Sequence, residues 1–168
     1  MRLTRKILPS LVLLVAVVIA AVPWALPETA SFILPLLLII LVFILTVQRG
    51  FELPSLSVFA GGLVMDILTA GPLGYWAAIF LLTHTLARLY RDRSAPREFG
   101  GLWVAFAGTA IAVSVAGWAL ASLYFVRIID WQPMVIASAT AIFLFPIIAW
   151  PMRHSLGLTN MAIFARRR

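Results

Sequence analysis

Asp66 and His84 are ionisable side chains inside otherwise apolar stretches of this 168-residue sequence. In a membrane-spanning segment such residues are candidate proton or ion sites, because burying a charge there is costly. Asp66 lies in the stretch 61–74, which also holds four glycines and a proline. A second interpretation is structural: the carboxylate accepts hydrogen bonds from backbone N–H groups at the turn 71–74 and at the start of the next helix. We favour the structural role, since Asp66 lies about one helical turn from the end of its own segment.

His84 is not expected to pair with Asp66. It lies about three turns into the following segment, so a direct contact would have to bridge about 10 Å of depth at 1.5 Å per residue. The sequence instead favours a neutral histidine hydrogen-bonded to threonine or to backbone within a helical bundle. The other histidine, His154, stands beside Arg153 near the end of the chain. Two distant histidines in a chain without cysteine predict no metal site, and we expect no cofactor.

Motifs for catalysis are missing from the sequence. It contains no Ser-x-x-Lys, no His-Glu-x-x-His, no phosphate-binding loop and no pair of membrane-facing carboxylates at a workable spacing. The sequence therefore predicts a protein that is not an enzyme.

The composition is that of an integral membrane protein. Hydrophobic residues make up 63% of the chain, charged residues 11%, and the mean hydropathy is +1.06, whereas soluble domains are about half apolar. The net charge of +7 comes from short flanks between apolar runs. Such flanks are typical of membrane topology signals. We therefore expect the lipid bilayer as a partner and do not expect nucleic acid.

A helix of roughly 20 apolar residues crosses a bilayer core of about 30 Å. Apolar runs of about this length predict an all-α bundle of six transmembrane helices in a single domain, 1–168. With six spans and a cytoplasmic N-terminus, every Lys and Arg except Arg127 falls on the cytoplasmic side. The positive-inside rule therefore favours six spans with both termini cytoplasmic. The expected spans are about 7–26, 30–47, 54–70, 73–90, 102–126 and 133–152.

A seam of small residues runs along the fifth expected span. Ala110, Ser114, Gly117 and Ala121 recur at spacings of four, three and four residues, a pattern that permits close contact between helices. One interpretation is a docking groove for a helix of another membrane protein, and the other is packing within this bundle. The second is favoured, because alanine is common in such spans.

The central motif and the overall layout resemble the MreD family of bacterial rod shape-determining proteins. The features behind the resemblance are a basic start, about six spans joined by short loops, and a Gly-x-x-x-Asp-x-x-x-x-x-x-Leu-Gly pattern. The pattern here comprises Gly62, Asp66, Leu73 and Gly74, with Gly71 and Pro72 inside it.

The resemblance implies a multi-pass protein of the bacterial inner membrane that belongs to the cell-elongation machinery. The implied partners are MreC, a single-span membrane protein, and through it the actin-like MreB filaments, a peptidoglycan glycosyltransferase and a penicillin-binding transpeptidase. The resemblance also implies a bundle similar to the substrate-binding subunits of energy-coupling-factor vitamin transporters, and such a subunit is the alternative function.

Features of the outer loops separate the two functions. A vitamin-binding subunit is expected to gather polar and aromatic residues around an outward cavity, whereas these loops offer mainly Glu28, Arg127 and the run 130–132. A scaffold needs lipid-embedded grooves with small residues, which the sequence has. We therefore expect a non-enzymatic scaffold that helps to organise peptidoglycan synthesis.

Overall fold

A computed structural model describes residues 2–22, 33–48, 52–93 and 99–152. These residues form six α-helices and no strand, which confirms the all-α prediction. Each expected apolar segment coincides with one helix. The helices are α1 (Arg2–Ala21), α3 (Ile33–Val47), α4 (Ser55–Leu68), α5 (Tyr75–Arg93), α6 (Phe99–Tyr124) and α7 (Gln132–Met152).

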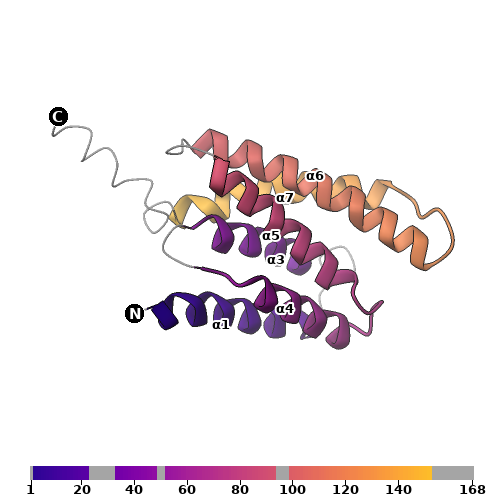
Figure 1. Cartoon of the computed structure of the whole chain (residues 1–168). Coiled ribbons are helices and arrows are strands. Elements are labelled where there is room, and N and C mark those ends of the chain that lie inside the picture. Colours follow the sequence, from indigo (N-terminus) through magenta and orange to yellow (C-terminus); the bar gives the residue numbers. More distant parts are fainter. Residues whose placement is uncertain (1, 23–32, 49–51, 94–98, 153–168) are drawn as a thin grey trace.

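The helices run back and forth between two ends of the bundle (Figure 1). At one end, here called the basic end, α1 begins and α3, α5 and α7 finish. At the other, here called the hairpin end, lie the connections α4–α5 and α6–α7. Helix α5 packs against α3, α4 and α6, and α3 also contacts α1 and α7. Helices α3 and α5 are therefore central, and α1 lies on one flank.

Three phenylalanine rings fill the space between α3, α6 and α7. Phe106 and Phe145 stack with ring centroids 4.3 Å apart, and Phe43 meets both rings edge-on at 5.2 and 5.8 Å. All three side chains are fully buried. Edge-to-face and stacked pairs add to the apolar burial, so this cluster fixes how the three helices pack.

Apolar residues cover the outer surface of the bundle, and its mainly apolar interior also holds a few polar side chains. The outward faces of α6 and α7 show this clearly, with Val104, Phe143 and Ile147 each about 70% exposed. So many large apolar side chains on the outer surface are not expected for a water-soluble domain. The buried polar residues are Thr46, Gln48, Asp66, Thr83, His84 and Thr109.

Two helices are long and apolar enough to cross a membrane, namely Phe99–Tyr124 and Gln132–Pro151. The apolar parts of α1, α3 and α4 have 14 or 15 residues, which at 1.5 Å per residue reach only about 21–23 Å. Helix α5 is long enough but carries polar and charged residues toward its end. By length and composition, two of the six predicted spans are therefore long and apolar enough to cross a membrane. Parts of the expected spans 7–26 and 30–47 lie outside the described residues.

Candidate functional site

The carboxylate of Asp66 joins α4 to the start of α5. Its Oδ2 accepts a hydrogen bond from the backbone N–H of Gly74, and its Oδ1 accepts one from the N–H of Trp76, both at 2.8 Å. The first N–H groups of a helix lack partners within the helix and carry partial positive charge. The fully buried Asp66 side chain satisfies two of them, so the hairpin contact predicted from the sequence is present.

The backbones of α4 and α5 cross at Gly62, one turn before Asp66. A Cβ atom at position 62 would lie 2.3 Å from Cα of Ala77, closer than atoms can approach. Only glycine permits this crossing, and it brings the start of α5 within hydrogen-bonding distance of Asp66. The neighbouring Gly61 differs, because a Cβ atom there would lie 3.4 Å from the side chain of Leu13.

The turn between α4 and α5 contains the other residues of the predicted motif. Helix α4 finishes with Ala70 in the left-handed conformation (φ 50°), and the N–H of Gly71 donates to the carbonyl of Asp66 at 3.1 Å, as in a Schellman C-cap. The carbonyl of Pro72 accepts the N–H of Tyr75, Gly74 has φ +93°, and Leu73 is 76% exposed. The motif therefore builds a hairpin with a polar interior and an apolar tip.

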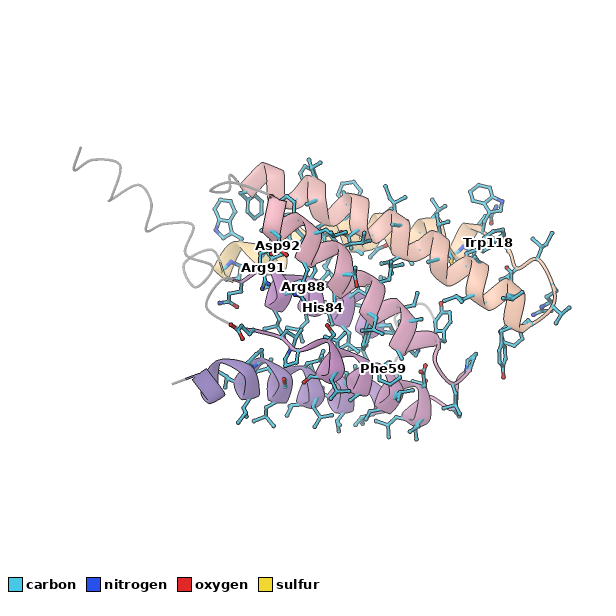
Figure 2. All side chains as sticks on the ribbon, in the orientation of Figure 1. Phe59, His84, Arg88, Arg91, Asp92 and Trp118 are labelled. Atoms are coloured by element: carbon cyan, nitrogen blue, oxygen red, sulfur yellow. The ribbon has the colours of Figure 1, made fainter. Side chains whose placement is uncertain are left out.

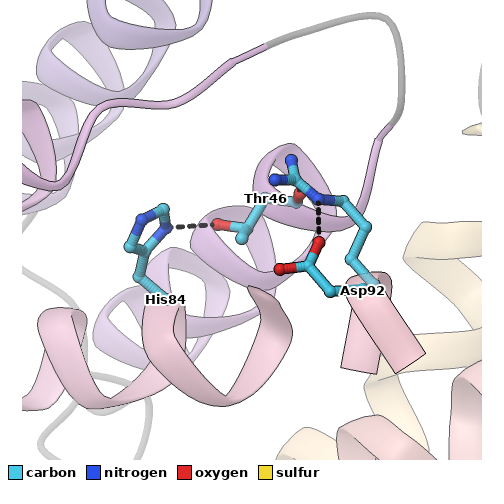
Figure 3. Close-up of polar contacts among 4 residues, drawn as sticks. Thr46, His84 and Asp92 are labelled. Carbon is cyan, nitrogen blue, oxygen red and sulfur yellow. Dashed lines mark hydrogen bonds and ion pairs between the residues drawn. The ribbon is translucent and has the colours of Figure 1, made fainter. Parts of the chain in front are cut away.

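His84 lies in a separate buried cluster toward the basic end. Its Nδ1 is 2.9 Å from Oγ1 of Thr46 on α3, and its Nε2 is 3.3 Å from Oγ of Ser55 at the start of α4. Figure 3 shows Thr46 and His84 pointing toward each other. Because the Thr46 hydroxyl donates its proton to the carbonyl of Val42 at 2.7 Å, it accepts from Nδ1–H. A hydrogen bond between Nε2 and the Ser55 hydroxyl completes the cluster, so His84 ties α5 to both α3 and α4.

Asp66 and His84 therefore have different partners, in line with the depth argument. The bonds of Asp66 reach α5 at residues 74 and 76, about 12–15 Å along the helix from His84. The sequence predicted a threonine or a backbone partner for His84 and did not identify Thr46 or Ser55. The available signal was a single hydroxyl, Thr46, near the end of the apolar run 33–47.

At the basic end, Arg91 caps the end of α3. Its Nη1 donates to the carbonyl of Thr46 at 3.1 Å, and its Nε forms a 3.4 Å ion pair with Asp92. A cation at a helix C-terminus satisfies a free carbonyl and complements the helix dipole. Figure 2 shows His84, Arg88 and Arg91 succeeding one another along α5 toward this end. Arg88 and Arg91 are both helical, because α5 continues to Arg93, beyond the end of the expected span 73–90.

A groove of about 650 Å³ opens between α6 and α7. Trp118 and Trp131 lie in its wall toward the hairpin end, and Trp118 is held by a hydrogen bond from its Nε1 to the carbonyl of Ile129 at 2.9 Å. The sequence indicated a groove only through the small residues of the fifth expected span, because the pairing of α6 with α7 shapes the groove that is observed. Its lining is Ile111, Ser114, Val115, Trp118, Trp131, Met134, Val135, Ser138, Ala139 and Ile142.

The predicted small-residue seam is divided between the bundle and this groove. Ala110 and Gly117 are buried, and a Cβ atom at position 117 would lie 3.0 Å from the hydroxyl oxygen of Tyr75 on α5. These two residues serve packing within the bundle. Ser114 lines the groove, and Ala121 is partly buried. A continuous docking seam of four residues is therefore not what the structure presents.

Within the described ranges, no group of three or more His, Asp or Glu side chains is placed to hold a metal ion. The two buried ionisable residues both make interhelical hydrogen bonds. No protein-family model, curated protein or solved structure matches this chain. The observations that bear on function are therefore the polar hairpin, the histidine cluster, the groove and the apolar outer surface.

Proposed function

We propose that the chain is a multi-span protein of the bacterial inner membrane. The placement of its polar and apolar residues supports this proposal, because the buried side chains of Asp66 and His84 and the apolar outer faces suit a lipid surrounding. Helix α5, with 19 residues, reaches about 28 Å, close to the thickness of a bilayer core. Helix α1 reaches about 30 Å when its basic first turns, residues 2–6, are counted with its apolar part. The shorter α3 and α4 are accommodated by local thinning of the bilayer.

The basic end faces the cytoplasm in this proposal. Arg88, Arg91 and Arg93 lie in the last turns of α5, and the basic residues at positions 2, 5 and 6 belong to the first turns of α1 at the same end. At the hairpin end the described residues hold a single basic residue, Arg127. This asymmetry follows the positive-inside rule and supports six crossings with both termini inside.

We further propose that the protein is a non-enzymatic scaffold of the cell-elongation machinery that binds the single helix of an MreC-like protein. The observation that carries this proposal is the groove between α6 and α7. Its wall is apolar and opens to the outside of the bundle, and Ser114, Ser138 and Ala139 give it small residues that allow a second helix to approach closely. Through the MreC-like protein, the scaffold would be linked to MreB filaments and to the enzymes of peptidoglycan synthesis.

The packing of the bundle supports a scaffold over a vitamin-binding subunit. The space enclosed by α3, α6 and α7 is filled by the rings of Phe43, Phe106 and Phe145. The wall of the groove is almost entirely apolar, whereas a pocket that selects a vitamin needs several placed polar groups.

Co-purification from detergent-solubilised membranes tests the proposal. We expect the MreC-like protein to be retained by the wild-type chain and by Ala112→Leu, which adds bulk on the exposed side of α6 away from the groove lining. Ser114→Leu, which fills the groove, should abolish retention while leaving the melting temperature unchanged. Retention by Ser114→Leu would contradict docking in the groove. A tightly bound vitamin in place of the partner would identify the transporter subunit instead.

A further inference from the structure

The connection between α6 and α7 exposes a cluster of large apolar side chains at the hairpin end. Val126 is 90% exposed and Ile128 87%, more than any other large hydrophobic residue described. Compact exposed apolar patches of this kind mark interaction surfaces. We call residues 123–131 the α6–α7 tip, and its exposed apolar and aromatic members are Leu123, Tyr124, Phe125, Val126, Ile128 and Trp131.

The backbone of the tip is strained at its most exposed residue. Val126 has φ 51°, the left-handed conformation that strongly disfavours β-branched side chains. The N–H of Val126 donates to the carbonyl of Leu123, and the N–H of Arg127 donates to that of Ser122, a Schellman C-cap in which glycine is the usual residue. Because the Val126 side chain is almost wholly exposed, packing within the described bundle does not offset the strain.

The tip is held rigid in this exposed arrangement. The indole Nε1 of Trp118 donates to the carbonyl of Ile129, and the N–H of Ile129 donates to the hydroxyl of Ser122 at 3.4 Å. Asp130, the acidic residue of the tip, accepts the N–H of Gln132 at the start of α7. The apolar side chains are thus presented in a fixed arrangement, which lowers the entropy lost on binding.

The length of α6 and the charge of Arg127 indicate what the tip meets. Helix α6 has 26 residues and is about 39 Å long, so it exceeds the bilayer core of about 30 Å and nearly equals its thickness with the headgroups, about 40–45 Å. The tip therefore lies at the level of the headgroups. The Arg127 guanidinium rests over the ring of Phe125, 5.9 Å from its centroid, and within the described residues it forms no ion pair, so it can bind a lipid phosphate.

We propose that the α6–α7 tip is an anchor in the headgroup layer of the phospholipid bilayer. Val126 and Ile128 insert at the boundary between headgroups and acyl chains, and Arg127 binds a lipid phosphate. The tip thereby fixes the depth and tilt of the α6–α7 pair that forms the groove. This inference rests on the membrane placement proposed above.

Site-specific fluorescence in vesicles tests the anchor. The natural sequence contains no cysteine, so the full chain carrying Val126→Cys or Ile128→Cys accepts a single environment-sensitive label. After reconstitution into phosphatidylglycerol–phosphatidylethanolamine vesicles, we expect blue-shifted emission. Lipids that carry a quencher near the headgroup should quench it more strongly than aqueous iodide does. A label at Phe143→Cys, exposed on α7, serves as the control and should respond most strongly to a quencher deep in the acyl chains.

The two proposals fail in different ways. Lipid quenching at position 143 together with iodide quenching at both 126 and 128 would overturn the anchor and leave the membrane placement intact. If labels at 126 and 128 are quenched by iodide alone but become shielded from iodide when a partner protein is added, the tip would be a protein contact instead of a lipid anchor. Iodide quenching at all three positions would overturn the membrane placement itself. In the Ile128→Cys chain, Arg127→Gln should increase access of iodide, and unchanged access would overturn the role of the phosphate contact.

Discussion

Gly62→Ala should separate α4 from α5 and break the polar hairpin. The added Cβ would lie 2.3 Å from Cα of Ala77, whereas carbon atoms in contact need about 3.5–4.0 Å, so α5 has to retreat by about 1.2–1.7 Å. The neighbouring N–H of Trp76 and that of Gly74 lie 2.8 Å from the Asp66 carboxylate. A retreat of this size stretches both bonds to about 4 Å, beyond hydrogen-bonding range.

The expected loss of stability combines two effects. Overpacking costs about 1–3 kcal/mol, and each hydrogen bond to a charged group contributes about 1.5–3 kcal/mol. Alanine recovers about 1 kcal/mol through its better helix propensity, so with both hydrogen bonds lost we expect Gly62→Ala to lose roughly 3–8 kcal/mol of unfolding free energy. Gly61→Ala is the matched control, because it gains the same propensity but meets only the movable side chain of Leu13 at 3.4 Å.

Thermal unfolding of the purified protein in detergent micelles, followed by near-ultraviolet circular dichroism, compares the two variants. Gly61→Ala should melt close to the wild type, and Gly62→Ala should melt far below it or fail to fold. Equal melting temperatures for both variants would refute the close crossing of α4 and α5 and, with it, the geometric link between Gly62 and Asp66.

Three further changes can be measured in the same way. Asp66→Ala should lose about 3–5 kcal/mol of unfolding free energy, because two N–H groups are left without their carboxylate. Asp66→Asn should lose about half of that, since its single side-chain oxygen can accept from only one of the two N–H groups. Equal losses for the two variants would contradict the two-oxygen geometry. Thr46→Val should lose about 1–3 kcal/mol by leaving Nδ1 of His84 without its partner. Thr85→Val, whose hydroxyl bonds only within its own helix, should change little, and similar losses for the two variants would contradict a stabilising Thr46–His84 hydrogen bond. Val126→Gly should gain about 0.5–1 kcal/mol by relieving the positive φ, and a lower melting temperature would show that the valine is not strained.

Pattern and composition were enough to predict the helices. Apolar runs bounded by charged flanks and prolines predict the approximate bounds of the helices that the structure describes, because helix formation in an apolar setting depends on local sequence and on satisfying every backbone hydrogen bond. The hairpin role of Asp66 was also predictable, since an acid one turn from a glycine-rich turn lies within reach of the next helix start. The sequence could not show that both carboxylate oxygens accept hydrogen bonds, because this depends on how closely α4 and α5 cross.

Contacts between residues distant in sequence required the tertiary structure. The Thr46–His84–Ser55 cluster joins three helices, and no spacing within one helix indicates which hydroxyl meets which ring nitrogen. The small-residue seam shows the same limit: its periodicity was visible, but the position of α5 assigns Gly117 to the bundle, and the position of α7 assigns Ser114 to the groove.

The sequence by itself thus determined the helical architecture and the polar hairpin, because both follow from local hydrogen bonding and apolar patterning. Only the tertiary structure decided which faces are buried, where the α6–α7 groove opens and that Val126 is strained, because these depend on how separate helices approach one another.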